Sequence, residues 1–178
     1  MPVETICLLF NHRSMYKQLF KLVLSLLMLF SVSAITAMTS LEQQPIYSLK
    51  YDPKRNAFDD GRAALKLAQE THRRVMIEVG GDWCMYCHIF DRFVRSDIEV
   101  EKRFFETFVL LKVNVSDENP NKEFLSGFKG INGYPYVFIT ETNGKVIYAN
   151  DMREMTIKGK PDKEKMFKFL ARWKLGEK

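Results

Sequence analysis

Short apolar runs alternate with amphipathic segments through most of the chain. Val75 to Val79 and Phe108 to Val115 have the length and composition of buried strands. Tyr136 to Thr140 and Lys145 to Tyr148 flank an Asn-Gly pair, which predicts a β-hairpin. The predicted helices run from Asp59 or Asp60 to Thr71, from the Cys84–Cys87 pair past Val94, from a capping box at Ser96 to Phe105, from Asn121 to Phe128 and from Lys163 to Leu175. This order predicts an α/β fold, with a central mixed sheet and helices on both faces.

The first forty residues follow a different pattern. Leu22 to Phe30 is an uncharged apolar run that is preceded by basic residues and followed by the small residues Ser31 to Ala34. This order is typical of a secretory signal peptide that is cleaved after Ala34. Translation from Met15 instead of Met1 would give a leader of more usual length.

A retained N-terminal membrane anchor is the alternative to cleavage. The uncharged stretch from Leu22 to Met38 lies at the lower limit of length for a membrane span. We therefore expect a signal peptide over residues 1–34, a lead-in over residues 35–55 with a short strand at Ile46 to Leu49, and one domain over residues 56–178. In either case the domain is exported, to the periplasm or beyond the cell.

Composition narrows the possible functions. The 178 residues are 46% hydrophobic and 28% charged, which suits a globular domain and excludes a disordered or collagen-like chain. The net charge of +5 arises between Lys158 and Lys178, which holds eight basic and three acidic residues. Such a segment is more often the solvated face of a helix than a nucleic-acid site, so we expect no nucleic-acid partner.

Cleavage of the leader removes Cys7 and leaves Cys84 and Cys87. In an exported protein, two cysteines at this spacing form a redox pair, a haem attachment site or half of a metal site. At the start of a helix, backbone N–H groups and the positive end of the helix dipole favour the thiolate of Cys84. Cys87 lies one turn further along the same face. Cys84 is therefore the candidate nucleophile, and Cys87 is the thiol that resolves the mixed disulfide.

The segment from Trp83 to Cys87, directly after an apolar strand, resembles the active site of the thioredoxin-like superfamily. Glu78 stands six residues before Cys84, where these proteins place a buried acid. Gly133-Tyr134-Pro135 is similar to their cis-proline segment, and Gly81-Asp82-Trp83-Cys84 resembles the branch that holds secreted thioredoxins and the C-terminal domain of the DsbD reductase.

This resemblance implies a thioredoxin-like fold and a thiol:disulfide oxidoreductase without cofactor or metal. It implies that Glu78 takes the proton of Cys87, and that Trp83, Tyr134 and Pro135 contact the substrate. The substrates would be protein disulfides or thiols, with a membrane thiol reductase as electron donor. Reduction or isomerisation of client disulfides is the favoured direction, and disulfide donation by an oxidase of the same fold is the alternative.

Other interpretations of the same residues stay open. Cys84 to His88 also matches the Cys-x-x-Cys-His pattern of c-type haem attachment, with His88 as axial ligand and Met152 or Met155 opposite it. A zinc site would have to draw on His72 and His88. A non-catalytic binding module of the same fold is a further alternative.

The chain departs from ordinary thioredoxins in three ways. Met85-Tyr86 stands between the cysteines, the acid is Glu instead of Asp, and about twelve extra residues from Asn150 to Pro161 precede the last helix. These differences leave the redox potential and the partner open.

Overall fold

The computed structural model describes Lys21 and residues 49–176, apart from the side chain of Arg153. The predictions of a leader and of a start at Met15 fall outside these residues. So does the strand predicted at Ile46 to Leu49, except for Leu49, which lies in a bend. Within the described part of the chain, no helix has the length and apolar character needed to cross a membrane.

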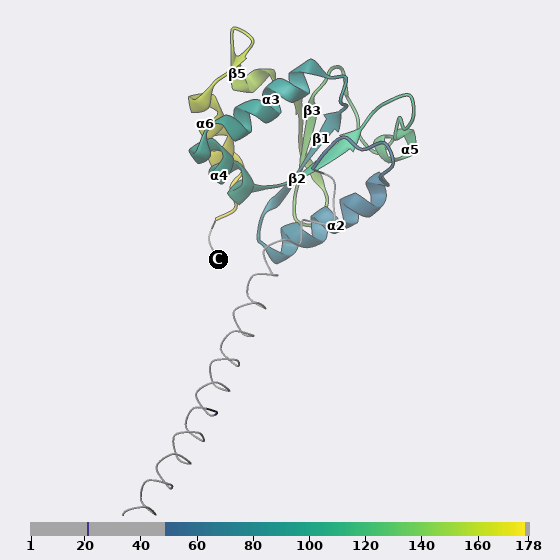
Figure 1. Cartoon of the computed structure of the whole chain (residues 1–178), viewed down its shortest axis with the longest axis horizontal. Helices are drawn as coiled ribbons and strands as arrows, with labels where there is room; N and C mark the ends of the chain where they lie inside the picture. The colour runs from purple at the N-terminus through teal and green to yellow at the C-terminus, as the bar shows by residue number, and fades with distance from the viewer. Residues whose placement is uncertain (1–20, 22–48, 177–178) are drawn as a thin grey trace, which may run out of the picture. The chain divides into compact units, whose positions relative to one another are not determined.

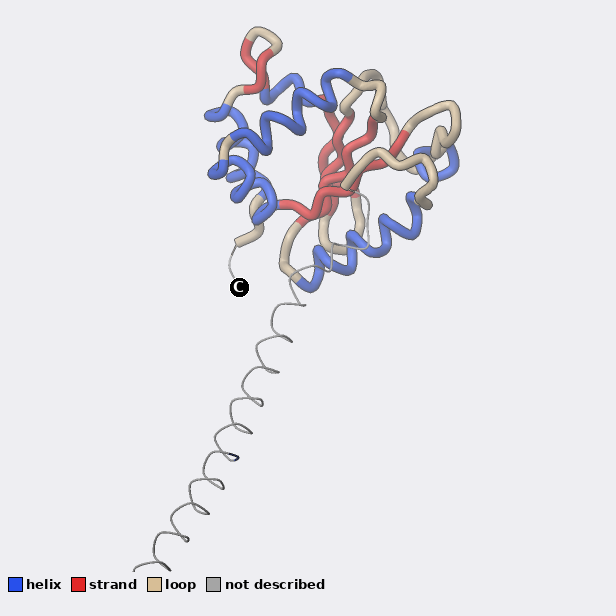
Figure 2. The backbone as a smooth tube through the Cα atoms, viewed as in Figure 1, coloured by secondary structure: helices blue, strands red, loops and turns tan. Residues whose placement is uncertain are grey.

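Four strands form the main sheet, in the order β2-β1-β3-β4 (Figure 2). β1 lies in the middle, parallel to β2 and antiparallel to β3, and β3 pairs antiparallel with β4. The α/β class and the mixed sheet predicted from the sequence are confirmed. The strands are β1 Arg74–Gly80, β2 Phe108–Asn114, β3 Tyr136–Thr140 and β4 Val146–Asp151.

Helices cover both faces of this sheet, with α3, α4 and α6 on one side and α2 on the other (Figure 1). Between β4 and α6, a 3-10 helix and a small hairpin occupy the extra segment noted in the sequence. The helices are α2 Ala57–Glu70, α3 Met85–Ser96, α4 Ile98–Thr107, α5 Lys122–Leu125 and α6 Lys163–Trp173, and the extra segment contains η2 Met152–Met155, β5 Thr156–Ile157 and β6 Lys160–Pro161.

Alternation along β1 sends successive side chains to opposite faces of the sheet. Val75, Ile77 and Val79 pack in the cluster that includes α2. Met76 packs with α3, α4 and α6 on the opposite face. By the same alternation, Glu78 points to the side of α3, which is where the helix carrying the two cysteines lies.

Three local predictions were wrong. The cap of α2 is Asn56, whose side chain accepts hydrogen bonds from the N–H groups of Phe58 and Asp59, whereas Asp60 is buried in an ion pair with Arg55. Asp97, not Ser96, caps α4. The start of α2 therefore lies before the predicted one, and the start of α4 lies one residue after it. Several neighbouring side chains can serve as a cap, which explains both errors.

The third error concerns α5, which the sequence pattern extends to Phe128. The helix has only four residues, Lys122–Leu125. Ser126 and Gly127 follow directly, and both are poor residues for a helix interior. Helical spacing of apolar residues alone therefore overestimated its length.

Candidate active site

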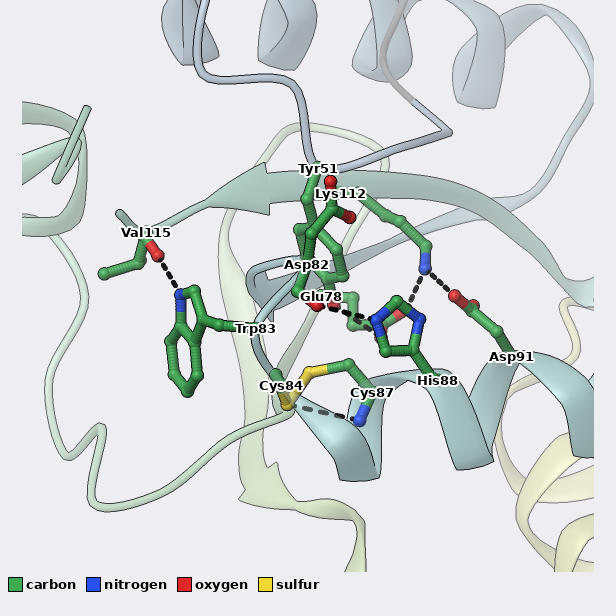
Figure 3. The surroundings of a disulfide bond; sticks show 10 residues. All are labelled: Tyr51, Glu78, Asp82, Trp83, Cys84, Cys87, His88, Asp91, Lys112 and Val115. Atoms are coloured by element: carbon green, nitrogen blue, oxygen red, sulfur yellow. Dashed lines mark hydrogen bonds and ion pairs between the residues drawn. A yellow bond between two sulfur atoms is a disulfide. The ribbon is translucent and has the colours of Figure 1, made fainter. Parts of the chain in front are cut away.

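A disulfide bond joins Cys84 and Cys87 at the start of α3, directly after the turn that leaves β1 (Figure 3). Cys84 is the N-cap residue of the helix, and its Sγ accepts a hydrogen bond of 3.2 Å from the backbone N–H of Cys87. After reduction, the same N–H group and the positive helix end favour a negative charge on this sulfur. Cys84 therefore lies where a thiol is activated as a thiolate.

The two cysteines differ in their access to solvent. Cys84 keeps 4% of its surface exposed, while Cys87 keeps none and packs with Tyr51 and Tyr134. An incoming thiol can therefore reach the disulfide at Cys84 and not at Cys87. The exposure of Cys84 is small, so a partner must approach it closely and from one side.

Glu78 is completely buried, and three side chains from other elements surround its carboxyl group (Figure 3). The hydroxyl of Tyr51 donates a hydrogen bond of 2.7 Å to Oε1. The Lys112 Nζ lies 3.7 Å from Oε2, beyond hydrogen-bond range, and forms an ion pair with Asp91 of α3. A carboxyl group, an ammonium group and a second carboxylate thus form one cluster on the sheet face that α3 covers, in which Glu78 and Lys112 are buried and Asp91 is partly exposed.

This environment shifts the protonation of Glu78. Burial raises the pKa of Glu78 to about 7, the positive charge of Lys112 opposes the increase, and the negative charge of Asp91 adds to it. A buried carboxyl group with a pKa near neutrality can both accept and release a proton at physiological pH. Tyr51 connects it to the redox pair, because Tyr51 packs in one cluster with the two cysteines and its hydroxyl donates to Glu78.

The turn between β1 and α3 allows this close packing because it contains glycines. A Cβ atom on Gly80 would lie 2.6 Å from the Cys87 Sγ and 2.8 Å from the Tyr51 Oη. A Cβ atom on Gly81 would lie 2.4 Å from the Trp83 Nε1. Any side chain at either position would therefore displace an atom of the site.

The predicted substrate-contacting residues lie together at the rim of the disulfide. Trp83 is 58% exposed, donates a hydrogen bond of 2.7 Å to the Val115 carbonyl, and contacts the Tyr134 ring edge-on at 5.2 Å between centroids. The Tyr134–Pro135 peptide bond is cis, and it precedes β3 directly. One aromatic wall therefore stands beside Cys84.

His88, the residue considered as a haem ligand, contacts the protein backbone. Its Nε2 lies 2.8 Å from the backbone carbonyl oxygen of Asp82 (Figure 3). The sulfur atoms of Cys84 and Cys87 are bonded to each other, as in the oxidised form of a redox pair.

Sequence reasoning missed three residues of the cluster around Glu78. Lys112 carried a usable signal, because it is a charged residue within an apolar strand run. Asp91 lies four residues after Cys87 and so shares its helix face. Tyr51 carried no such signal, since it comes from an irregular segment before α2 and its approach depends on the tertiary fold.

Comparisons with known proteins agree with this geometry. A family model described as thioredoxin-like matches residues 56–141. The thiol:disulfide interchange protein DsbD of Haemophilus influenzae (strain PittGG) is 26% identical over 112 residues, which make up 62% of this chain and only 19% of DsbD.

Two solved structures share the fold. The crystal structure of a disulphide isomerase from Xylella fastidiosa Temecula1 matches with a TM-score of 0.59 and 24% identity, over 70% of this chain and 96% of that one. The oxidised C-terminal domain of Neisseria meningitidis DsbD matches with a TM-score of 0.51 and 18% identity, over 67% of this chain and 97% of that one. Residues 56–141 thus match the thioredoxin-like family model, and the described chain has a thioredoxin-like fold that resembles the C-terminal domain of DsbD and a disulphide isomerase, with Cys84 and Cys87 as its disulfide-bonded Cys-x-x-Cys pair.

Proposed function

We propose that this protein is an exported thiol:disulfide oxidoreductase that reduces or isomerises disulfides of client proteins in the periplasm. One observation carries the proposal: a disulfide that is accessible only at Cys84 lies in the same packed site as a buried carboxyl group that titrates near neutral pH. These are the parts that thiol–disulfide exchange requires.

The exchange proceeds in two steps. The thiolate of Cys84 attacks a client disulfide, which forms a mixed disulfide and releases one client thiolate. Cys87 then loses its proton to the carboxylate of Glu78 and attacks the Sγ of Cys84, which releases the second client thiolate. The client gains two electrons, and the domain ends with the Cys84–Cys87 disulfide. A dithiol donor reverses these steps and restores the reduced domain.

The rim residues suit a polypeptide client. Trp83 and Tyr134 form an aromatic surface beside Cys84, and residues 132–135 lead into β3 along the same side. A client segment in extended conformation can lie along this edge, with backbone hydrogen bonds at Tyr134 and its cysteine over Cys84. Trp83, Tyr134 and Pro135 are therefore the proposed client-binding residues.

Export and the electron donor complete the proposal. The leader predicted at residues 1–34 would place the domain in the periplasm, or on the membrane if the leader is retained. Re-reduction there calls for a donor that brings electrons across the membrane, so a membrane thiol reductase is the proposed partner. Donation of disulfides is the alternative direction. A change of about 30 mV in the reduction potential corresponds to only about 1.4 kcal/mol for this two-electron couple, so small differences around the cysteines decide the direction.

Trapping of clients tests the proposed roles of the two cysteines. Cys87→Ser removes the resolving thiol, so clients should stay covalently attached to Cys84 and appear as adducts that a reductant dissolves. Cys84→Ser is the matched control and should trap none, because Cys87 is completely buried. Non-reducing electrophoresis and mass spectrometry of both variants give the readout. Equal trapping by the two variants would contradict the assignment.

A further inference from the structure

The extra segment between β4 and α6 forms one wall of a cavity beside the disulfide. The 3-10 helix η2 and the β5–β6 hairpin contribute this wall, and the hairpin extends beside α3 (Figure 1). Helix α3 forms the facing wall. The cavity has a volume of about 410 Å³, which falls in the range of sites that hold an apolar group.

Methionine and aromatic side chains dominate its interior. Met152, Met155 and Met166 come from the extra segment and α6, and Phe90 and Phe93 come from α3. Methionine side chains are flexible and polarizable, so a surface rich in them adapts to apolar groups of different shape. The cavity therefore suits a range of bulky apolar side chains.

The cavity is continuous with the client-binding rim. Tyr86, which stands between the two cysteines, and the Tyr134–Pro135 pair line its end nearest the disulfide. Tyr134 also packs against the cluster that contains Cys84 and Cys87. A chain that lies along residues 132–135 with its cysteine at Cys84 would thus pass the mouth of the cavity.

We propose that this cavity binds a bulky aliphatic or aromatic side chain of the client, close in sequence to the client cysteine. The site would make the domain selective for cysteines with such a neighbour. This inference rests on the proposed function, because it assumes that clients meet Cys84 as extended segments. A free small molecule fits less well, since backbone and side chains of the proposed client-binding edge form part of the lining.

Paired peptides test the selectivity. Each peptide carries one cysteine as a mixed disulfide with glutathione, and the pair differs only in Phe or Ser two residues from that cysteine. The reduced protein should react with the Phe peptide about tenfold faster in kcat/KM, as burial of one apolar side chain allows. Hydroxyethyl disulfide, which has no side chain to bind, serves as the reference substrate.

Two variants of one lining residue link the selectivity to the cavity. Thr156 lines the cavity and its neighbour Ile157 is exposed on the same hairpin. Thr156→Glu places a charge in the cavity, and Thr156→Trp fills the cavity without a charge. Both variants should bring the ratio of kcat/KM for the Phe peptide to kcat/KM for the Ser peptide close to one. Ile157→Glu is the matched control, with the same added charge one residue away, and should keep the ratio.

The outcomes separate this inference from the proposed function. Equal rates for the two peptides, together with reduction of hydroxyethyl disulfide, would overturn the cavity proposal and leave the function intact. If no disulfide is reduced, the function fails, and binding of cysteine-free versions of the peptides decides on the cavity. Changes in the NMR chemical shifts of Phe93 and Met155 on addition of the Phe peptide, and not of the Ser peptide, would support the cavity proposal. The absence of such changes would overturn it. A dimer that Thr156→Glu dissociates would also overturn it, in favour of a second copy as occupant.

Discussion

The protonation of Glu78 depends on contributions of opposite sign from its neighbours. Complete burial favours the neutral acid, and so does the charge of Asp91, whereas Lys112 and the hydrogen bond from Tyr51 favour the carboxylate. The balance leaves the pKa of Glu78 at about 7. The group can therefore change its charge within the pH range in which thiols exchange.

The raised pKa of Glu78 predicts a pH-dependent stability of the oxidised protein. The unfolded state releases this proton near pH 4.5, while the folded state retains it up to about pH 7. The contribution of Glu78 to the free energy of unfolding should therefore be fully present below pH 4.5 and decline by roughly 3 kcal/mol as the pH rises through about 7. Urea unfolding between pH 4 and pH 8 measures the change.

The matched variant is Glu78→Gln, which keeps an acceptor for the Tyr51 hydroxyl and cannot ionise. The difference in stability between the two proteins should change across this pH range and be constant outside it. Lys112→Met removes the nearby positive charge and should move the transition to higher pH, because that charge lowers the pKa of Glu78. Parallel pH curves for the original protein and Glu78→Gln would show that Glu78 keeps an ordinary pKa.

The site residues that belong to a recognisable sequence motif could be predicted from the sequence, and those outside such a motif could not. Cys84 and Cys87 are recognisable as a pair by their spacing, and Glu78 by its position in the resemblance to thioredoxin-like proteins. Lys112 lies beside Glu78 through the parallel register of β1 and β2, which places the two residues opposite each other. That register arises from the fold, so the pair cannot be seen along the chain.

At the scale of elements, the turn between β1 and α3 determines the geometry of the site. Gly80 ends the strand, Gly81 follows, and Cys84 already caps the helix. The short distance keeps the disulfide at the carboxyl end of the central strand. Trp83 fixes the outer side of the turn through its hydrogen bond to the Val115 carbonyl.

Gly80→Ala should destabilise the protein because the added methyl group has no space. It would lie 2.6 Å from the Cys87 Sγ and 2.8 Å from the Tyr51 Oη, both within the packed site. We expect a loss of about 1–3 kcal/mol in the free energy of unfolding, which is typical of overpacking. Chemical denaturation of the oxidised protein measures this loss.

Gly61→Ala provides a control with the opposite sign. Gly61 lies within α2, and its added methyl group would make an ordinary contact of 3.5 Å with the Phe124 ring. Alanine favours a helix interior by up to about 1 kcal/mol over glycine. This variant should be as stable as the original or more so. Equal stability of Gly80→Ala and the original protein would refute the account of the turn.

Predictions of elements succeeded where the apolar pattern was strong and failed at boundaries. The strand from Phe108 was predicted from its apolar run, and all seven of its positions are buried in the structure. The caps of α2 and α4 were misplaced because more than one possible cap adjoins each start, Asn and Asp at α2 and Ser and Asp at α4, and only the folded backbone selects one of them.

At the scale of the whole domain, the order of elements was sufficient to predict an α/β fold with a mixed sheet, and the resemblance of the Trp83–Cys87 segment implied a thioredoxin-like fold. The pattern contained no information on the cavity, because its walls come from α3, the residues before β3 and the segment between β4 and α6. The sequence identified that last segment only as an addition of unknown effect. Its position beside the disulfide follows from the path of the chain in space.

The central claim is that Cys84 and Cys87 form a reducing redox pair, and its redox equilibrium tests this most directly. The purified protein is equilibrated with glutathione buffers of varied ratio, and the fluorescence of Trp83 beside the disulfide reports the reduced fraction. We predict one two-electron transition at a potential near or below that of glutathione. A pair that stays reduced until the buffer is strongly oxidising would contradict the account and identify a disulfide donor.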